Sequence, residues 1–313
     1  MYTIIIFIWT KGGCPDKKYY MQRSREQELE MLAYEAFIRR AAELDLPFML
    51  KGSYVTRQYF QDPGDRIPND LDWVYLPALT DPQETVLRLD DWMKKVTEMF
   101  ANDGVRFRSF TENAFWRMID YAMAGDFPTT STDLKCWIGE DIIEPCRIDV
   151  SFNLDVEVPA VPLLYRPLRG NAFMIPKTVP LALQVSWKLH QTLVRPRFKD
   201  LFDLIHLVQN PAFTRDVLAQ TWQALVNECR VDGTDPNRIG YLLSGELDWL
   251  FSYTIDGSWN FWRHNIKKKG DLLYEQTAAA ITNVEKLPHD LSEFKEQLRL
   301  ALLYAGFGKD PGS

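Results

Sequence analysis

The chain has 313 residues, of which 46% are hydrophobic and 25% are charged, so it can form one large domain or two ordinary domains with a buried core. Its formal net charge of −7 excludes a general electrostatic attraction to nucleic acid or to anionic membranes, and any such binding must come from local basic patches. Four histidines, and four cysteines without a Cys-x-x-Cys pair, argue against a zinc site and favour a reduced, cytoplasmic setting.

The chain begins with a hydrophobic stretch, Met1–Trp9, which is far shorter than the roughly 18 residues that a membrane span needs. It also lacks the basic residues that open a signal peptide. We therefore expect no membrane segment and no targeting segment. Residues 1–20 are interpreted as an N-terminal extension. Three explanations stay open: they form a strand, they form an arm that contacts a partner, or they precede a natural start at Met21.

Apolar residues at helical spacing predict helices, whereas short apolar runs, or apolar residues that alternate with polar ones, predict strands. In the first half of the chain these patterns predict, in order, a helix over 24–44, strands over 48–50 and 73–76, a helix over 84–101, and strands over 105–110, 132–138 and 146–152. Residues 111–127 fit either a helix or a strand.

A proline-rich stretch, residues 158–180, is interpreted as the connection between two domains. We expect an α/β domain over residues 21–157 before it and a helical domain over residues 181–313 after it. In the second domain the spacing predicts helices, in order, over 181–193, from near Pro196 to 208, over 214–228, over 236–251, and up to Gly306.

A candidate phosphate site lies where the first predicted strand ends, at Lys51-Gly52-Ser53. Glycine lets backbone amides come close to a ligand, and Ser53 adds a hydroxyl where a helix should begin. Taken alone, Gly-Ser is equally an ordinary turn between a strand and a helix.

A candidate metal site lies at the entry to the second strand, in Asp70-Leu71-Asp72. Because side chains alternate along a strand, the two carboxylates share one face about 6–7 Å apart, while Leu71 points into the core. Two ionised carboxylates at that distance repel each other, and a divalent cation relieves the repulsion. A solvated strand end explains Asp-x-Asp equally well when the motif is considered alone.

In this order, Gly-Ser followed by Asp-x-Asp resembles the first motif of the polymerase-beta-like nucleotidyltransferases. The resemblance implies an α/β (α+β) fold, in which a nucleotidyltransferase catalytic domain with a mixed sheet over residues 21–157 precedes the helical domain. The 16 residues between Ser53 and Asp70 exceed the usual gap, and we interpret residues 61–69 as a loop insertion.

The same resemblance implies a third carboxylate on a neighbouring strand. Asp149 lies in an alternating segment, where it shares a face with Arg147 and Ser151. On that ground we favour it over Asp133 and Asp141. A solvent-facing strand residue is the simpler explanation of Asp149.

A second cluster of charged residues opens the helical half, with Lys188, Arg195, Lys199, Asp200 and Asp203. Lys199 and Asp203 are neighbours at i,i+4 on a helix, so a solvated helix face with intrahelical ion pairs is the common explanation. A functional role is favoured because the cations cluster at a helix start in an acidic protein. A triphosphate needs such cations.

Taken together, the motifs resemble the AbiEii/AbiGii nucleotidyltransferase toxins over roughly residues 35–210. The matching residues, in order, are Lys51-Gly52-Ser53, Arg57, Asp70-Leu71-Asp72, Lys188, Arg195 and Lys199-Asp200-Leu201-Phe202-Asp203-Leu204. The first twenty residues and the last hundred match nothing specific.

The resemblance implies transfer of a nucleoside monophosphate from a nucleoside triphosphate (NTP) to an acceptor hydroxyl, with two Mg²⁺ ions, or Mn²⁺ in their place. The implied metal ligands are Asp70, Asp72 and Asp149. Gly52 and Ser53, beside Lys51, would hold the β- and γ-phosphates. Lys188 and Lys199 would neutralise the leaving pyrophosphate, Asp200 and Asp203 would position those cations, and Arg57 and Arg195 would contact phosphate.

As partners the resemblance implies an RNA acceptor such as tRNA and a cognate antitoxin, in a toxin–antitoxin or phage-defence system. Two other interpretations stay open. One is an inactive relative that acts as a binding module, and the other is a nucleotidyltransferase for a small molecule of the aminoglycoside type. The sequence leaves open the nucleotide, the acceptor and the oligomeric state.

Overall fold

The computed structural model describes residues 17–308 except 120–127, 155, 157, 253, 265–276 and 283. Most of the expected N-terminal extension therefore lies outside the described residues, as does the second half of the ambiguous segment 111–127. The chain divides into two units. The sheet unit comprises the residues up to Val55 and Asp70–Thr178, and the helical unit comprises Thr56–Asn69 and the residues from Val179 onward.

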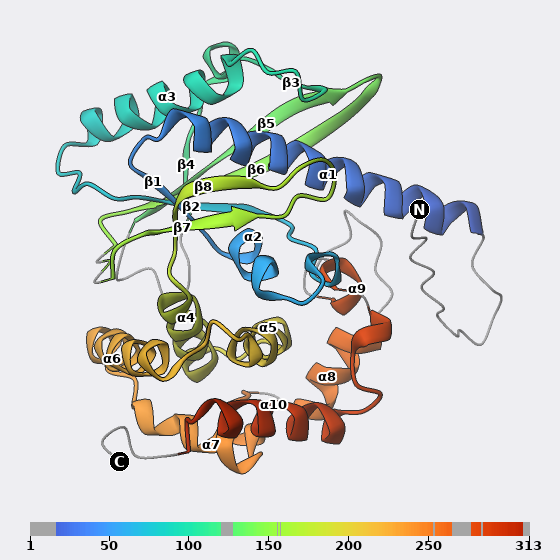
Figure 1. The fold of residues 1–313 in the computed structure, drawn as a ribbon, viewed down its shortest axis with the longest axis vertical. Coiled ribbons are helices and arrows are strands. Elements are labelled where there is room, and N and C mark those ends of the chain that lie inside the picture. The colour runs from blue at the N-terminus through green and yellow to red at the C-terminus, as the bar shows by residue number, and fades with distance from the viewer. Residues whose placement is uncertain are drawn as a thin grey trace. The chain divides into compact units, whose positions relative to one another are not determined.

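The sheet unit is built on a mixed sheet, as the sequence predicts (Figure 1). Its described strands are β1 (Phe48–Lys51), β2 (Leu71–Tyr75), β3 (Val105–Phe107), β4 (Arg117–Ile119), β5 (Thr129–Ile138), β6 (Asp141–Phe152), β7 (Val161–Tyr165) and β8 (Phe173–Thr178). They follow the order β3-β5-β6-β2-β1-β8-β7, and β4 pairs with β5. The pairs β2–β6 and β1–β8 are parallel, and the others are antiparallel.

Two helices, α1 (Lys17–Leu44) and α3 (Pro82–Glu98), supply the core of the sheet unit. Phe37 of α1 contacts Trp73 of β2 and Trp92 of α3, and Phe48 stacks on Trp92 at 4.0 Å. Leu71 and Trp73 are buried on this side of β2. Asp72 lies between them in the chain, so the alternation of the strand turns it to the opposite face.

The proline-rich stretch contains the antiparallel hairpin β7–β8, where the sequence analysis expects a connection. Pro162 lies in β7, at the edge of the sheet, where a residue without an N–H is tolerated. The predicted strand over 105–110 is shortened to β3, because a 3₁₀ turn begins at Phe110.

The helical unit has an aromatic core in which Phe198 contacts Phe251, Trp259, Trp262 and Phe294. Its described helices are α4 (Leu181–Val194), α5 (Phe198–Gln209), α6 (Arg215–Asp232), α7 (Gly240–Ser244), α8 (Ile255–His264), α9 (Ala278–Ile281) and α10 (Leu291–Ala305), and the short α2 (Ser53–Thr56) leads into this unit.

The last helix ends at Gly306 as predicted, with a φ of +102° that suits glycine. The continuous helix expected over 236–251 is wrong. Gly245, at a φ of +80°, ends α7 after five residues, and 3₁₀ turns flank it.

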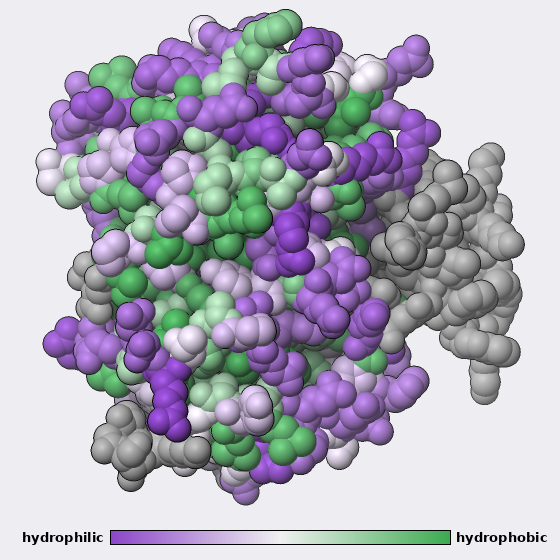
Figure 2. Space-filling model, in the orientation of Figure 1, coloured by the Kyte–Doolittle hydropathy of each residue, from purple (hydrophilic) through white to green (hydrophobic). Residues whose placement is uncertain are grey.

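The length and hydropathy of a helix decide whether it can cross a membrane. Among the described helices, none combines the length and the apolar character that crossing requires. On the face drawn in Figure 2, hydrophilic residues are spread widely and apolar residues form small separate groups.

A buried ion pair gives a first prediction. Arg40 of α1 donates to both carboxylate oxygens of Asp103 at 2.8 and 3.0 Å and to the Val105 carbonyl, and its side chain is 3% exposed. Arg40→Met removes the cation that pairs with Asp103, which keeps a hydrogen bond from the Val105 N–H, and should lower the free energy of unfolding by about 3 kcal/mol in urea titrations.

The matched control is Arg88→Gln, in an i,i+4 pair with Glu84 where both side chains are about half exposed. It should change the free energy of unfolding by less than about 0.5 kcal/mol. Equal effects from the two variants would refute a structural role for the Arg40–Asp103 pair.

Candidate active site

Two carboxylates predicted to act together lie side by side in the sheet. Strands β2 and β6 are parallel, and their register pairs Asp72 with Asp149. Directly paired residues point to the same face, and neighbouring strands are about 4.8 Å apart. The structure therefore places both side chains together on the face opposite the one that buries Leu71 and Trp73.

Each of these carboxylates has a cation beside it. Asp149, at 2% exposure, accepts a hydrogen bond from Nε of Arg147 at 3.1 Å. Lys51 Nζ lies 3.9 Å from Oδ1 of Asp72. The two cations offset the repulsion between the carboxylates. Sequence reasoning assigned no role to Arg147, although its position two residues before Asp149 in an alternating strand signals that the two share a face.

The glycine before Ser53 lies close to the Asp72 carboxylate. Gly52 has a φ of +73°, and a Cβ atom there would lie 2.3 Å from Oδ2 of Asp72. Only glycine leaves room for Asp72 at this point. Ser53 Oγ is buried and makes no hydrogen bond to any described residue. Such an atom is a donor and acceptor suited to a ligand.

Asp70 directly precedes β2 and is partly exposed. Its negative charge acts on Tyr34 of α1, whose pKa is raised well above its usual value by burial first and by nearby negative charges, including Asp70, second. The Tyr34 hydroxyl accepts a hydrogen bond from the backbone N–H of Arg147 at 2.8 Å. Tyr34 is thus a neutral group close to the candidate carboxylates, and no motif in the sequence indicates it.

The donor atoms on this face suit Mg²⁺ or Mn²⁺, which prefer carboxylate oxygens. Within the described ranges, no three histidine, cysteine, aspartate or glutamate side chains already converge as a complete metal site. Asp72 and Asp149 fit a cation in donor type and in facing. Asp72 and Asp149 could therefore bind a metal together. Asp70 or oxygens of the substrate would complete the set of ligands.

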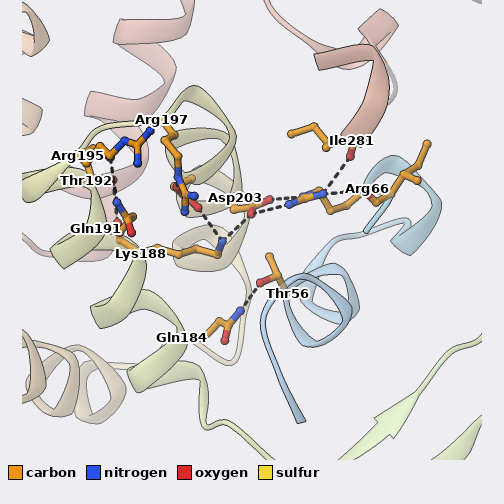
Figure 3. Close-up of polar contacts among 12 residues, drawn as sticks. Thr56, Arg66, Gln184, Lys188, Gln191, Thr192, Arg195, Arg197, Asp203 and Ile281 are labelled. Atoms are coloured by element: carbon orange, nitrogen blue, oxygen red, sulfur yellow. Dashed lines mark hydrogen bonds and ion pairs between the residues drawn. The ribbon is translucent and has the colours of Figure 1, made fainter. Parts of the chain in front are cut away.

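The helical unit holds the second predicted cluster (Figure 3). Lys188 of α4 donates to Asp203 at 2.7 Å and to Asp200 at 3.2 Å, and both aspartates lie on α5. Arg197 donates to Asp200 at 2.6 Å. Asp200 and Asp203 are buried, at 4% and 0% exposure of their side chains. The interpretation of these residues as a solvated helix face is therefore wrong.

The remaining predicted cations occupy different places in the helical unit. Lys199 is partly exposed on α5, and its charge contributes to lowering the pKa of Asp200. Arg195 is exposed where α4 ends, and its carbonyl accepts from Gln191 at 3.1 Å. Arg57 is buried, and its Nε donates to the Pro63 carbonyl at 3.0 Å.

Sequence reasoning missed Arg66, which lies in the predicted loop insertion. Its guanidinium donates to Asp203 at 2.8 Å and to the Ile281 carbonyl at 3.3 Å. Thr282 Oγ1 donates to the Asp65 carbonyl at 2.6 Å, and a β-bridge joins Arg66 to Thr282. The insertion is thus packed onto the helical unit. No local pattern predicts a partner 137 residues away.

The neighbouring cations keep both buried aspartates ionised. Burial alone would raise the pKa of Asp203, but Arg66 and Lys188 together lower it below the usual value. Burial likewise opposes the effect of Arg197 and Lys188 on Asp200, whose pKa is lowered strongly. Lys188 therefore stays between two negative charges at neutral pH.

The chain is similar to known proteins in sequence and in fold. The sequence model of one family, described as nucleotidyl transferase AbiEii toxin of type IV toxin–antitoxin systems, matches residues 36–299. No curated protein gives a significant match.

Among solved structures, the nucleotidyltransferase toxin MenT4 from Mycobacterium tuberculosis aligns with a TM-score of 0.52 and 15% sequence identity, over 93% of this chain and 85% of that chain. An antigenic nucleotidyltransferase-like protein from Paracoccidioides brasiliensis aligns over 66% of this chain and 89% of its own, at 13% identity and a TM-score of 0.35 that is too low to indicate a shared fold. The MenT4 match shows the fold.

Gly52→Ala tests the close approach of Asp72. Gly104 has a similar φ of +77°, but a Cβ atom added there would have nothing within 4 Å, so Gly104→Ala reports backbone strain alone, about 1–2 kcal/mol. Gly52→Ala should cost a further ~1–3 kcal/mol, because Asp72 has to move. Equal losses of stability in urea unfolding would contradict the contact.

Arg66→Met tests the buried network through pH. A lowered folded-state pKa means that ionised Asp203 stabilises the fold above its unfolded pKa of about 3.9, and that this contribution is lost as the pH falls through the folded value. The variant should therefore be about 3 kcal/mol less stable at neutral pH, and the deficit should shrink below about pH 4.

Urea unfolding of both proteins between pH 7 and pH 3.5 measures the deficit. Arg88→Gln, which removes an exposed pair with Glu84, is the control and should show no such trend. A deficit for Arg66→Met that is the same at every pH would rule out an electrostatic origin.

Proposed function

The chain belongs to the AbiEii family of nucleotidyl transferase toxins, and we propose that it transfers a nucleoside monophosphate from an NTP to a hydroxyl group of RNA in a magnesium-dependent reaction. The observation that carries the proposal is the parallel register of Asp72 and Asp149 beside Lys51-Gly52-Ser53. The 3′ end of a tRNA is the first acceptor to test. We further propose a cytoplasmic toxin, restrained by a cognate antitoxin and serving in phage defence.

In the reaction, the acceptor oxygen forms a bond to the α-phosphorus while the bond from that phosphorus to the bridging oxygen breaks. Pyrophosphate leaves, and the hydroxyl proton passes to water. Asp72 and Asp149, with Asp70, are the residues proposed to hold Mg²⁺. When bound, the metal lowers the pKa of the acceptor hydroxyl and neutralises phosphate charge.

The residues around the carboxylates are proposed to hold the triphosphate. The missing side chain of Gly52 leaves room for Asp72, its backbone amide is proposed to bind phosphate, and the buried Ser53 Oγ offers a hydrogen bond that no described residue takes. Lys51 adds a positive charge.

For the helical unit, we propose that Lys188 and Lys199 neutralise the pyrophosphate and that Arg57 and Arg195 contact phosphate. The ion pairs from Asp200 and Asp203 to Lys188 agree with the proposed positioning role of these aspartates.

The test is incorporation of each α-labelled NTP, with magnesium, into total RNA and total protein. Asp72→Asn and Asp149→Asn should each lower incorporation about a hundred-fold or more, since each removes a negatively charged metal ligand. Chelation with EDTA should abolish it. Asp141→Asn, on the same strand as Asp149 but paired with Arg25 and 40% exposed, should keep the wild-type rate.

Three results would overturn the proposal. Label in protein instead of RNA would change the acceptor class. Full incorporation by the Asp72→Asn and Asp149→Asn variants would remove the assigned site. A folded wild-type protein that labels neither RNA nor protein with any NTP would favour a binding module or a small-molecule acceptor.

A further inference from the structure

Side chains of β5 alternate between the core side and a second side, on which Asp149 of β6 lies at 2% exposure. Along β5, Leu134 and Cys136 are buried on the core side, while Asp133, Lys135 and Trp137 are partly exposed on the other side. The register places Asp149 opposite Ser131, on this second side. Along β5 the alternation therefore makes one polar face from the candidate active site to Trp137, past an irregularity in the β5–β6 pairing between Leu134 and Cys136.

Basic side chains recur along this face. The strand registers place Arg117 of β4 beside Ser131, Arg147 of β6 beside Asp133, and Arg106 of β3 beside Trp137. We name the set Arg117, Arg147, Lys135, Trp137 and Arg106 the β5 track. Three of its cations pair with carboxylates: Arg117 with Asp133, Lys135 with Glu144 at 2.7 Å, and Arg147 with Asp149.

Two of these cations, Arg117 and Arg147, lie close to the candidate site and stay partly exposed to solvent. Arg117 pairs with Asp133, and Arg147 pairs with Asp149, while their side chains stay 43% and 36% exposed. The Arg117–Asp133 pair is partly exposed at both side chains and contributes little to stability, whereas Arg147 compensates the buried charge of Asp149. Guanidinium groups in this position can instead exchange a carboxylate for a phosphate, which they bind in a bidentate manner.

The far end of the track carries an aromatic platform. The guanidinium of Arg106 lies 3.9 Å from the centre of the Trp137 ring, and Lys135 Nζ lies 6.0 Å from it. Trp137 pairs with Ile142, which is 59% exposed. Bases of single-stranded nucleic acid stack on tryptophan rings and on arginine planes, whereas paired bases have no free face.

The spacing suits an extended strand. Trp137 lies six positions after Ser131, the residue opposite Asp149, which corresponds to roughly 20 Å of β-strand. A short single-stranded segment can therefore place its phosphates along Arg117, Arg147 and Lys135 and stack a base at Trp137, with its hydroxyl at Asp149. A globular protein acceptor would gain nothing from the stacking position.

We propose that the β5 track binds a single-stranded segment of the acceptor RNA and directs its hydroxyl to Asp149. This inference rests on the proposed function, because it assigns the acceptor site of that reaction. The phosphates are bound by the basic residues, and a base stacks on Arg106 and Trp137.

Binding is tested on the full chain, with EDTA and without NTP, by fluorescence anisotropy of a labelled single-stranded RNA octamer over a salt series. Trp137→Ala should weaken binding roughly 5- to 150-fold, the range observed for loss of one stacked base. Arg117→Gln should reduce the slope of log affinity against log salt by about 0.7, the value for one lost phosphate contact to a single strand.

Two matched controls should bind as the wild type does. Arg88→Gln removes an exposed arginine from α3, and Trp249→Ala removes a 70% exposed tryptophan from the helical unit. Circular dichroism melting of every variant verifies that it folds. Single-stranded DNA and a blunt RNA duplex of equal length serve as comparison ligands, and the duplex should bind more weakly.

The outcomes separate the two proposals. The Asp149→Asn variant should no longer incorporate label into RNA but should still bind RNA. This result would support both the proposed reaction and the β5 track. If wild type labels RNA while Trp137→Ala and Arg117→Gln bind and react unchanged, the track is refuted and the proposed function stands. If RNA binds along the track but no RNA is labelled, the proposed reaction fails and the binding site stands. Equal losses from the control variants would also refute the track.

Discussion

The sheet unit depends on one electrostatic constraint, the placement of Asp72 and Asp149 on adjacent parallel strands. Two carboxylates about one strand spacing apart repel each other, so the fold has to supply compensation. It does so with Arg147 beside Asp149, with Lys51 near Asp72, and with a glycine at position 52 that leaves space for Asp72. The result is a pair of carboxylates whose neighbouring cations, Lys51 and Arg147, are partly exposed. A bound metal ion could therefore take the place of these cations beside the carboxylates.

In the helical unit the carboxylates are buried and surrounded by cations. Asp200 and Asp203 are withdrawn from water, where an unpaired carboxylate would be very unfavourable, and Lys188, Arg66 and Arg197 surround them. Removing one partner would leave a buried charge uncompensated, so the network holds its members in a defined geometry. Lys188 is thereby positioned by two carboxylates, and the segment that contains Arg66 is tied to the helices by the same pairs.

Local sequence patterns were sufficient to identify the class of fold and most of the candidate site. Apolar periodicity located α1, α3, α4, α5, α6 and α10, because amphipathic helices of that length must bury one face. Alternation located β1, β2 and β6 and correctly turned Asp72 and Asp149 away from the core. The ordered motifs from Lys51 to Leu204 indicated the AbiEii family, which the family match confirms. Each helix, strand or single motif is complete within a short stretch of chain, and only the order of the motifs extends over a longer one.

The long-range pairings, in contrast, follow only from the folded chain. That Asp149 lies directly beside Asp72 follows from the β2–β6 register, and residues 77 positions apart share no local signal of it. The insertion before Asp70 joins the helical unit through Arg66, and a proline-rich stretch becomes the hairpin β7–β8 because its prolines are tolerated near a sheet edge. The sequence left a solvated helix face as the simpler explanation of Asp200 and Asp203, and the fold buries both. In each case the deciding factor is a partner distant in the chain, which burial and strand pairing select and which no local pattern can specify.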